Sequence, residues 1–202
     1  MKKRLKVLMM ILIFALFTGC KDIFTVENKH EEYLKGKHYV EMKIKDYGTM
    51  EIELDADVAP ITVTNFINLV KDGFYDGLPI HRVQKDFVIQ GGASYDILNE
   101  KTIKGEFDAN GVSNDISHER GVISMARTGD LTSGFDSAST QFFIVLKDNP
   151  SLDHYYAGFG HVTKGMDVAD KMASKITNVD EMGFIKDENK MPIIEYIKEI
   201  EK

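Results

Sequence analysis

A few polar side chains lie within the most apolar stretches of this sequence. Arg82 and Gln90 flank Phe87 in the segment PIHRVQKDFVIQGG, residues 79–92. A guanidinium is always charged and projects several N–H donors from one plane, so an apolar slot would make it a strong hydrogen-bond donor. The alternation of apolar and polar residues also fits an ordinary half-buried strand whose arginine points to water. The segment alone leaves both interpretations open.

The same combination recurs twice further along the chain. Arg127 follows the run GVISMA, and Gln141 precedes the run FFIVL. Each segment by itself also fits a buried strand with one exposed polar residue. No nucleophile–base pair can be recognised, and no G-x-S-x-G, P-loop or HExxH motif is present. The six histidines lack the i, i+4 or H-x-H spacing of metal ligands, so we expect neither a metal nor a cofactor: His30, His38, His81, His118, His154 and His161.

The elements that would position these side chains are mostly short strands. Period-two alternation at 40–44 and 50–54, around a turn at 46–48, predicts a β-hairpin. Further strands are expected at 121–127, 140–146, 157–162 and 192–200. Pro60 and the apolar spacing up to Phe74 predict one amphipathic helix, and residues 164–176 predict a second. Many strands with two separated helices favour a β-barrel or sandwich over a βαβ fold.

Several motifs in register resemble the cyclophilin family of peptidyl-prolyl cis/trans isomerases. They are HRVQKDFVIQGG, KGEF, HERGVISMAR, STQFFI, LDHYYAGFG and VTKGMDVADK, in the family's order from about residue 40 to 200. The resemblance implies a mainly β fold, a closed eight-stranded antiparallel barrel capped by two α-helices. It also implies a folding-assisting enzyme that speeds rotation of X–Pro bonds without covalent chemistry.

The resemblance further implies a role for individual residues. Arg82 would donate a hydrogen bond to the prolyl nitrogen, and the catalytic set would be Arg82, Phe87, Gln90 and Phe143. The substrate-binding set would be Val88, Ala126, Arg127, Gln141, Leu152 and Tyr156. In a regular strand Phe87 and Gln90 would face opposite sides, so both can reach one pocket only if that segment is bulged or twisted.

Three positions depart from the family's pattern. Arg127 stands where asparagine is frequent, and Ser151 stands where many members carry a tryptophan, so we expect weak cyclosporin binding. The loop at 128–140 is longer than in compact members and could change which residues are accepted beside the proline. Two other functions stay open: a non-catalytic module that binds proline-containing segments, and a small-ligand β-barrel lipoprotein.

The N-terminal segment has the pattern of a lipoprotein signal peptide. Basic residues precede an eleven-residue apolar run at 7–17, which is too short to span a bilayer, and TGC follows. Cys20 is the only cysteine, so a disulfide is excluded and lipid attachment is expected. We therefore predict a signal peptide at 1–19, a lipidated cysteine and flexible tether at 20–37, and an isomerase domain at 38–202. A short signal with a chance cysteine, or an uncleaved anchor, is the alternative.

The charge of the chain bears on its partners. The signal segment carries four basic residues and no acidic one, so its removal would change the formal charge from −7 to −11. This acidic balance argues against nucleic-acid binding and against broad adhesion to anionic lipid. The expected partners are proline-containing segments of exported or surface proteins, with a lipid anchor as the membrane link. A monomer outside the cytoplasmic membrane is expected.

Overall fold

The first two strands form the hairpin that the sequence predicts. β1 (Lys37–Ile44) pairs antiparallel with β2 (Gly48–Asp55), and Asp46 in the turn has φ 65°. The structure, a computed structural model, describes residues 32–93, 101–129 and 132–202. Residues 33–202 form one unit with its own core. The signal peptide, Cys20 and most of the predicted tether lie outside the described residues.

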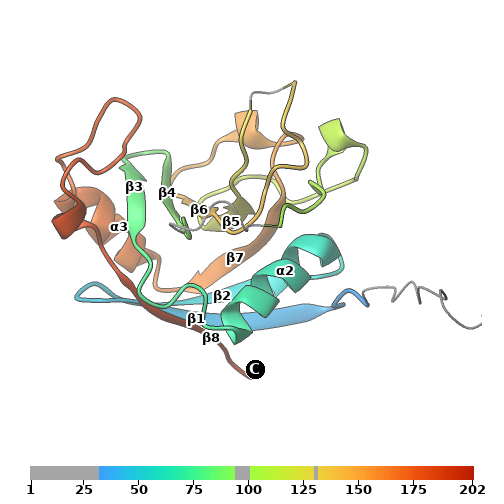
Figure 1. The fold of residues 1–202 in the computed structure, drawn as a ribbon, viewed down its shortest axis with the longest axis horizontal. Helices are drawn as coiled ribbons and strands as arrows, with labels where there is room; N and C mark the ends of the chain where they lie inside the picture. The colour runs from blue at the N-terminus through green and yellow to red at the C-terminus, as the bar shows by residue number, and fades with distance from the viewer. Residues whose placement is uncertain (1–31, 94–100, 130–131) are drawn as a thin grey trace, which may run out of the picture. The chain divides into compact units, whose positions relative to one another are not determined.

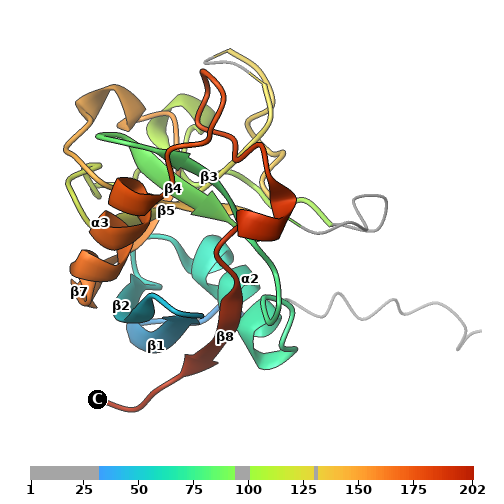
Figure 2. The same ribbon diagram turned by 90° about the vertical axis from the view of Figure 1, so that its left-hand side faces the viewer.

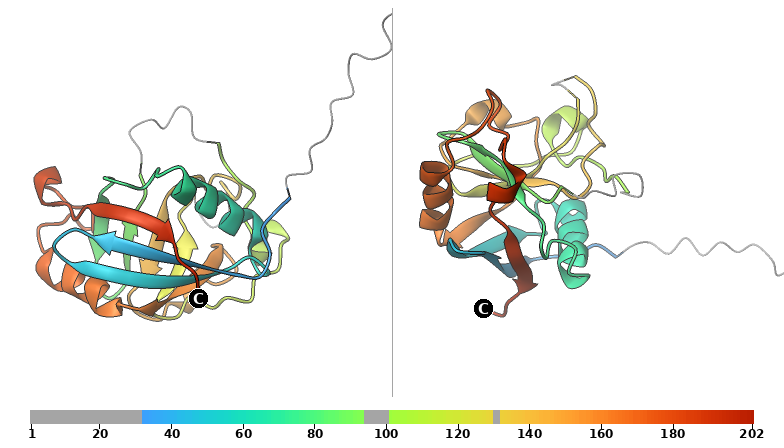
Figure 3. Two further views of the ribbon diagram at one scale, coloured as in Figure 1. Left: turned by 90° about the horizontal axis from the view of Figure 1, so that it is seen from below. Right: turned by 60° about the vertical axis from the view of Figure 1, so that its left-hand side comes forward.

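Six more strands extend the hairpin into one curled antiparallel sheet (Figure 1). The order of its strands is β3-β4-β6-β5-β7-β2-β1-β8. Figure 3 shows β8, β1 and β2 side by side. The remaining strands are β3 (Ile80–Gln84), β4 (Val88–Gly91), β5 (Val122–Met125), β6 (Phe142–Val145), β7 (Gly158–Lys164) and β8 (Ile194–Glu199).

The predicted closed barrel is wrong in one respect, because no ladder joins the edge strands β3 and β8. Among the described residues, Pro79 and Ile193 form only an isolated bridge there. Ile80 N–H donates to the carbonyl of Pro192 at 2.8 Å. Gly77 N–H donates to the carbonyl of Ile194 at 2.8 Å, and Ile194 N–H donates to that of Leu78 at 2.9 Å, so β8 contacts the segment that leads into β3 and not the rest of that strand. The molecule is thus a curled half-barrel.

A different segment occupies the outer edge of β3. Val83 N–H donates to the carbonyl of Gly183 at 2.8 Å, and Ile185 N–H donates to the carbonyl of His81 at 3.0 Å. These bonds use the backbone groups that a closing β8 would have needed. Residues 183–185 therefore take the place of the missing barrel contact.

Two α-helices lie apart on separate sides of the curled sheet (Figure 2). They are α2 (Pro60–Lys71), with Pro60 in its first turn, and α3 (Met166–Lys175). Phe66 from α2 and Met172 from α3 are both fully buried in the main core. The amphipathic patterns that predicted the helices are thus explained by packing. Three 3₁₀ turns, at Asp108–Asn110, Pro150–Leu152 and Glu188–Lys190, complete the secondary structure of the residues that the structure describes.

The strands β4, β5 and β6 are buried on both faces. Ile89, Ile123 and Ile144 lie opposite one another and face the main core. On the other face Val88, Val122, Phe143, Val145 and Leu152 form a second, smaller apolar cluster. Burial on both faces explains the apolar run at 142–146 and the run at 121–125, in which Ser124 is the one polar residue, since a strand with one wet face would alternate. The second cluster is the floor of the candidate site.

The unit begins slightly before the predicted boundary at residue 38. Leu34 packs against the core, its N–H donates to Thr64 Oγ1 at 2.8 Å, and β1 already starts at Lys37. Residues 33–37 therefore contact the domain, where the sequence predicts the end of a tether. Within the described residues we find no helix of the length and apolarity that crossing a bilayer would require.

A buried glutamate holds the start of α2. Its N-cap residue, Ala59, offers no side-chain hydrogen bond. Glu106, only 2% exposed, instead accepts from the N–H groups of Ile61 at 3.0 Å and Thr62 at 2.8 Å. A carboxylate at a helix N-terminus satisfies otherwise unpaired donors and interacts favourably with the helix dipole. The KGEF motif thus fixes α2 against the sheet.

Replacing Glu106 with glutamine should therefore destabilise the fold. The amide NH₂ would face one backbone N–H donor, and an unpaired buried donor costs about 1–3 kcal/mol. Urea denaturation of Glu106→Gln would measure the loss. The exposed Glu119→Gln serves as control, with a change expected within about 0.5 kcal/mol. Equal midpoints for the two variants would contradict this assignment.

Candidate active site

Four neighbouring strands align one row of side chains on the outer face of the sheet. Arg82 on β3 lies opposite Gln90 on β4, Gln90 lies opposite Phe143 on β6, and Phe143 lies opposite Ser124 on β5. Residues opposite each other in an antiparallel sheet share a face. We call these four residues the cross-strand row. Register therefore places the predicted arginine, glutamine and phenylalanine together.

Phe87 reaches the same face because it lies in a turn, not in a strand. Asp86 before it has φ 59°, and Phe87 N–H donates to the carbonyl of Gln84 at 3.1 Å. β4 begins only at Val88. Strand alternation consequently does not apply to Phe87, and it lines one pocket with Val88 and Gln90. The irregularity that allows Phe87 and Gln90 to reach one pocket is therefore this turn before β4.

The pocket above the row has a volume of about 210 Å³. All the predicted catalytic residues line it, and so do all the predicted substrate-binding residues except Gln141. Its walls are Arg82, Phe87, Val88, Gln90, Ala126, Arg127, Phe143, Leu152, Tyr156 and Phe184. The ring of Tyr156 meets that of Phe143 edge to face at 5.6 Å. An apolar slot with a few convergent polar groups is typical of a ligand site.

Arg82, like Arg127, is one of the two charged side chains that line this slot. Its NH1 donates to Gln90 Oε1 at 3.1 Å, its NH2 to Gln84 Oε1 at 2.6 Å, and its Nε to the carbonyl of Met182 at 2.7 Å. Its other N–H donors have no acceptor among the described residues. Burial lowers the pKa of Arg82, which Tyr156 and Asp180 oppose; an arginine nevertheless stays charged at neutral pH.

Gln141 is linked to the pocket through Gln90. Gln90 Nε2 donates to Gln141 Oε1 at 3.0 Å, so a chain of hydrogen bonds runs from Arg82 to Gln141. Gln141 itself lines a neighbouring cavity of about 420 Å³, which shares Gln90, Ala126 and Arg127 with the pocket. The structure thus places Gln141 beside the pocket and not in its wall.

Arg127 lies between the two cavities and is surrounded by aromatic rings. Its guanidinium carbon lies 4.8 Å from the ring centre of Tyr156, 5.3 Å from that of Phe135 and 5.5 Å from that of Phe107. Its Nε donates to the carbonyl of Tyr155 at 2.9 Å, and its NH1 to that of Ser133 at 2.8 Å. Arg127 thus ties the long loop to the pocket rim.

A buried histidine supports the pocket from beneath. The ring of His118 stacks on Phe143 at 6.0 Å. Its Nδ1 lies 2.9 Å from Asp153 Oδ1, and its Nε2 lies 3.0 Å from Ser124 Oγ. Burial lowers the pKa of His118, and Asp153 opposes this only in part. In the neutral ring Nδ1–H donates to the carboxylate, and Nε2 accepts from the serine hydroxyl.

Besides Gln84 and the His118, Asp153 and Ser124 cluster, two further contributors to the site were missed from the sequence. Phe184 lines the pocket, and the carbonyl of Met182 accepts from Arg82. Both lie in the segment DEMGFIKDENK, where an aromatic residue in a polar stretch was the one available signal. Ser151, at the position of the family's frequent tryptophan, hydrogen-bonds Asn149 and does not line the pocket.

Comparison with known proteins shows the family to which the chain belongs. The family model described as cyclophilin type peptidyl-prolyl cis-trans isomerase/CLD matches residues 39–196. Peptidyl-prolyl cis-trans isomerase A of Dickeya dadantii is 43% identical over 135 residues, covering 62% of this chain and 66% of that protein. A peptidyl-prolyl cis-trans isomerase of Acinetobacter baylyi is 44% identical over 144 residues, covering 69% of this chain and 73% of the relative.

Solved structures show the same fold. A cyclophilin type peptidyl-prolyl cis-trans isomerase of Cryptosporidium parvum superposes with a TM-score of 0.69 at 23% identity, covering 83% of this chain and 99% of that one. A second structure of that protein, in the presence of the dipeptide Ala-Pro, gives a TM-score of 0.67 and covers 81% and 99% of the two chains. With the family model matched over residues 39–196, this chain belongs to the cyclophilin family, the cyclophilin-type peptidyl-prolyl cis-trans isomerases.

Proposed function

We propose that this chain catalyses X–Pro bond rotation by a hydrogen bond from Arg82 to the prolyl nitrogen. The observation that carries the proposal is a guanidinium held by three acceptors at the edge of an apolar pocket, with N–H donors left over. The Ala-Pro dipeptide used with the Cryptosporidium relative supports proline as the ligand.

The reaction needs no covalent step. Resonance in the amide sets a barrier of about 18–20 kcal/mol, and uncatalysed exchange at X–Pro takes tens to hundreds of seconds. When the bond is twisted, the nitrogen loses its conjugation and regains a lone pair. A donor aimed at that nitrogen binds the twisted form more tightly than either planar form, and such differential binding is what accelerates a reaction.

Arg82 suits this role because its neighbours fix its plane. Gln84, Gln90 and the Met182 carbonyl hold three of its N–H groups. The Phe87 ring centre lies 5.5 Å from its guanidinium carbon. A donor that is already oriented needs no reorganisation when charge develops in the transition state. Gln90 thus acts as a positioning residue for the guanidinium.

The apolar walls would hold the proline ring. We propose that Phe143, Phe87, Val88 and Leu152 grip the ring and exclude water, while Ala126, Arg127 and Tyr156 contact the chain around it. Exclusion of water strengthens the hydrogen bond from Arg82. Gln141 would contribute through Gln90 and from the neighbouring cavity.

The clients would be exported or surface proteins. The enzyme itself would lie outside the cytoplasmic membrane, anchored by a lipid on Cys20. The basic, apolar and TGC segments at the N-terminus motivate this part of the proposal. A folding catalyst held there would act on slow prolyl steps of newly exported chains.

Removal of the guanidinium should abolish catalysis. In Arg82→Ala we expect the catalysed cis/trans exchange of a short Ala-Pro peptide, followed by NMR, to fall about 100-fold or more, the loss typical when one preorganised transition-state donor is removed. Arg82→Lys keeps the charge but loses the planar fork, and should also lose most activity. Lys85→Ala, on the adjacent exposed turn, is the matched control.

Two outcomes would contradict this assignment. Undiminished exchange in Arg82→Ala would place the chemistry elsewhere. Peptide shifts that show binding, without catalysed exchange in the wild type, would make the chain a proline-binding module.

Acidification should destabilise the fold through His118. The unfolded histidine takes up a proton below a pH of about 6.5, whereas the folded site, with its lowered pKa, favours the neutral ring. The unfolded state then binds more protons, so the stability due to His118 is complete above that pH and is lost as pH falls through the folded pKa. Burial also lowers the pKa of His81, so His81 should add to this loss of stability at low pH.

Urea midpoints at pH 7.5, 6.5 and 5.5 would measure this loss. With falling pH, the urea midpoint of His118→Gln should decline less than that of the wild type. The variant has lost one of the two histidines whose pKa is lowered by burial. The exposed His161→Gln should decline like the wild type. An unchanged decline in His118→Gln would contradict the assignment.

Lipid attachment is tested at Cys20. We expect the full chain, expressed in bacteria with labelled fatty acid, to carry the label in the membrane fraction. Cys20→Ser should lose the label, and globomycin should block processing. A wild-type protein without label in the soluble fraction would count against the anchor.

A further inference from the structure

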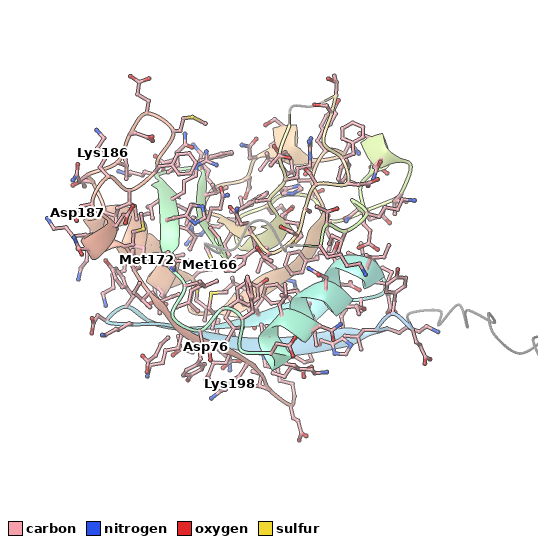
Figure 4. The ribbon with its side chains drawn as sticks, viewed as in Figure 1. Asp76, Met166, Met172, Lys186, Asp187 and Lys198 are labelled. Atoms are coloured by element: carbon pink, nitrogen blue, oxygen red, sulfur yellow. The ribbon has the colours of Figure 1, made fainter. Side chains whose placement is uncertain are left out.

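The segment between α3 and β8 has a definite conformation despite its polar sequence. Residues 176–193 leave α3 and return to β8, and Lys186 and Asp187 are labelled on this segment in Figure 4. Val179 and Ile185 form one isolated antiparallel bridge, and Arg82 and Phe184 form another. The turn at 180–184 therefore adds to the sheet beyond β3.

Asp180 and Gly183 fix the shape of this turn. Asp180 Oδ1 accepts from the N–H groups of Met182 and Phe184, both at 2.9 Å. Gly183 has φ +88°, and a Cβ at this position would lie 2.8 Å from the Cβ of Gln84. Only glycine fits both the backbone conformation and the space. The side chains on either side of Gly183 are therefore presented from a constrained backbone.

Met182 and Phe184 expose apolar surface at this turn. Their exposed fractions are 60% and 37%, and Tyr33, at 39%, is the one other exposed large hydrophobic residue in the described part of the chain. Two of the three thus flank a single glycine. Apolar surface that is gathered at one place on a soluble domain is typical of a binding site.

Phe184 connects this surface to the pocket. Its ring centre lies 5.5 Å from the guanidinium carbon of Arg82, and the ring stacks on His81 at 6.1 Å. Phe184 also belongs to the pocket wall. Arg82 is thus in contact with two rings, Phe87 and Phe184, and the apolar surface of the pocket continues past it.

The strand order places this surface at one end of the site. Ala126 follows β5, whereas Phe184 lies beyond β3, at the other end of the order β3-β4-β6-β5. A polypeptide whose proline fills the pocket must leave it on two sides. One side of the chain meets Ala126 and the neighbouring cavity. On the opposite side, the exposed apolar surface next to the pocket belongs to Phe184, with Met182 on the same turn.

We infer that Met182 and Phe184 form a ledge that binds an apolar side chain next to the substrate proline. The inference rests on the proposed isomerase function and adds the class of residue that is preferred on one side of the proline. When a large apolar side chain of the substrate packs on the Phe184 ring, both lose surface to water and form an aromatic contact. This is sufficient for about a tenfold gain in kcat/KM.

The test compares peptides within each protein sample. Three short peptides carry a single proline flanked by alanine on both sides, by phenylalanine before it, or by phenylalanine after it. NMR exchange gives kcat/KM for each peptide with the full chain and with Phe184→Ala, Met182→Ala and Tyr33→Ala. Tyr33→Ala removes an equally exposed aromatic side chain that lines none of the cavities described above.

We expect the wild type to favour phenylalanine at one flanking position about tenfold over alanine. Phe184→Ala should bring this ratio close to unity, Met182→Ala should reduce it in part, and Tyr33→Ala should leave it unchanged. A general loss of activity would lower all rates but would not change the ratio.

Failure of the ledge and failure of the isomerase would give different results. A wild type that exchanges all peptides equally, or a Phe184→Ala variant that keeps the ratio, would overturn the ledge and leave the isomerase intact. A wild type that exchanges none of them would overturn the isomerase itself, and the ledge with it.

Discussion

A charge held at the edge of an apolar pocket must be hydrogen-bonded, and most of this site follows from that constraint. Desolvation of an ionised side chain without partners costs several kcal/mol. Arg82 obtains its partners from its own strand through Gln84, from the next strand through Gln90 and from a distant turn through Met182. These bonds also set the plane of the guanidinium. The same interactions therefore make the charge tolerable and aim its unused donors.

The two-sided burial of β4, β5 and β6 has a similar double effect. One face completes the core with the helices, and the other forms the pocket floor on which Phe143 lies. His118, Asp153 and Ser124 then satisfy one another beneath Phe143. The pocket wall is thus connected to the core through packed side chains and through the hydrogen bonds of His118, one to the Asp153 carboxylate and one to the Ser124 hydroxyl.

Much of the fold was predictable, because periodicity reports burial directly. The hairpin at 40–54 and the helix from Pro60 follow from apolar spacing alone. The family resemblance supplied the site residues, and the structure brings all but one of them into the pocket wall. Gln141 precedes β6 and lies one hydrogen bond away from Gln90, in the wall of the neighbouring cavity.

The open edge and the Phe184 turn were not predictable from the same patterns. The outer edge of β3 is bonded to residues 183–185 and not to β8, and such contacts between segments far apart in the sequence are not reported by local apolar spacing. Around Phe184, the polar segment has no apolar residues at the regular spacing of a strand or a helix. The guanidinium of Arg127 lies among Phe107, Phe135 and Tyr156, which are far apart from one another in sequence, so local patterns could not reveal this aromatic environment.

The bond between Arg82 and the Met182 carbonyl joins positions 100 residues apart. A ribosome makes the chain from its N-terminus, so the arginine is synthesised long before its last acceptor. Contacts of such large sequence separation form late, because the loop between them must close first. The guanidinium therefore acquires its final orientation only once nearly the whole domain has been made. Each new molecule must therefore complete its own β3 edge before it could act, as we propose, on the proline of another chain.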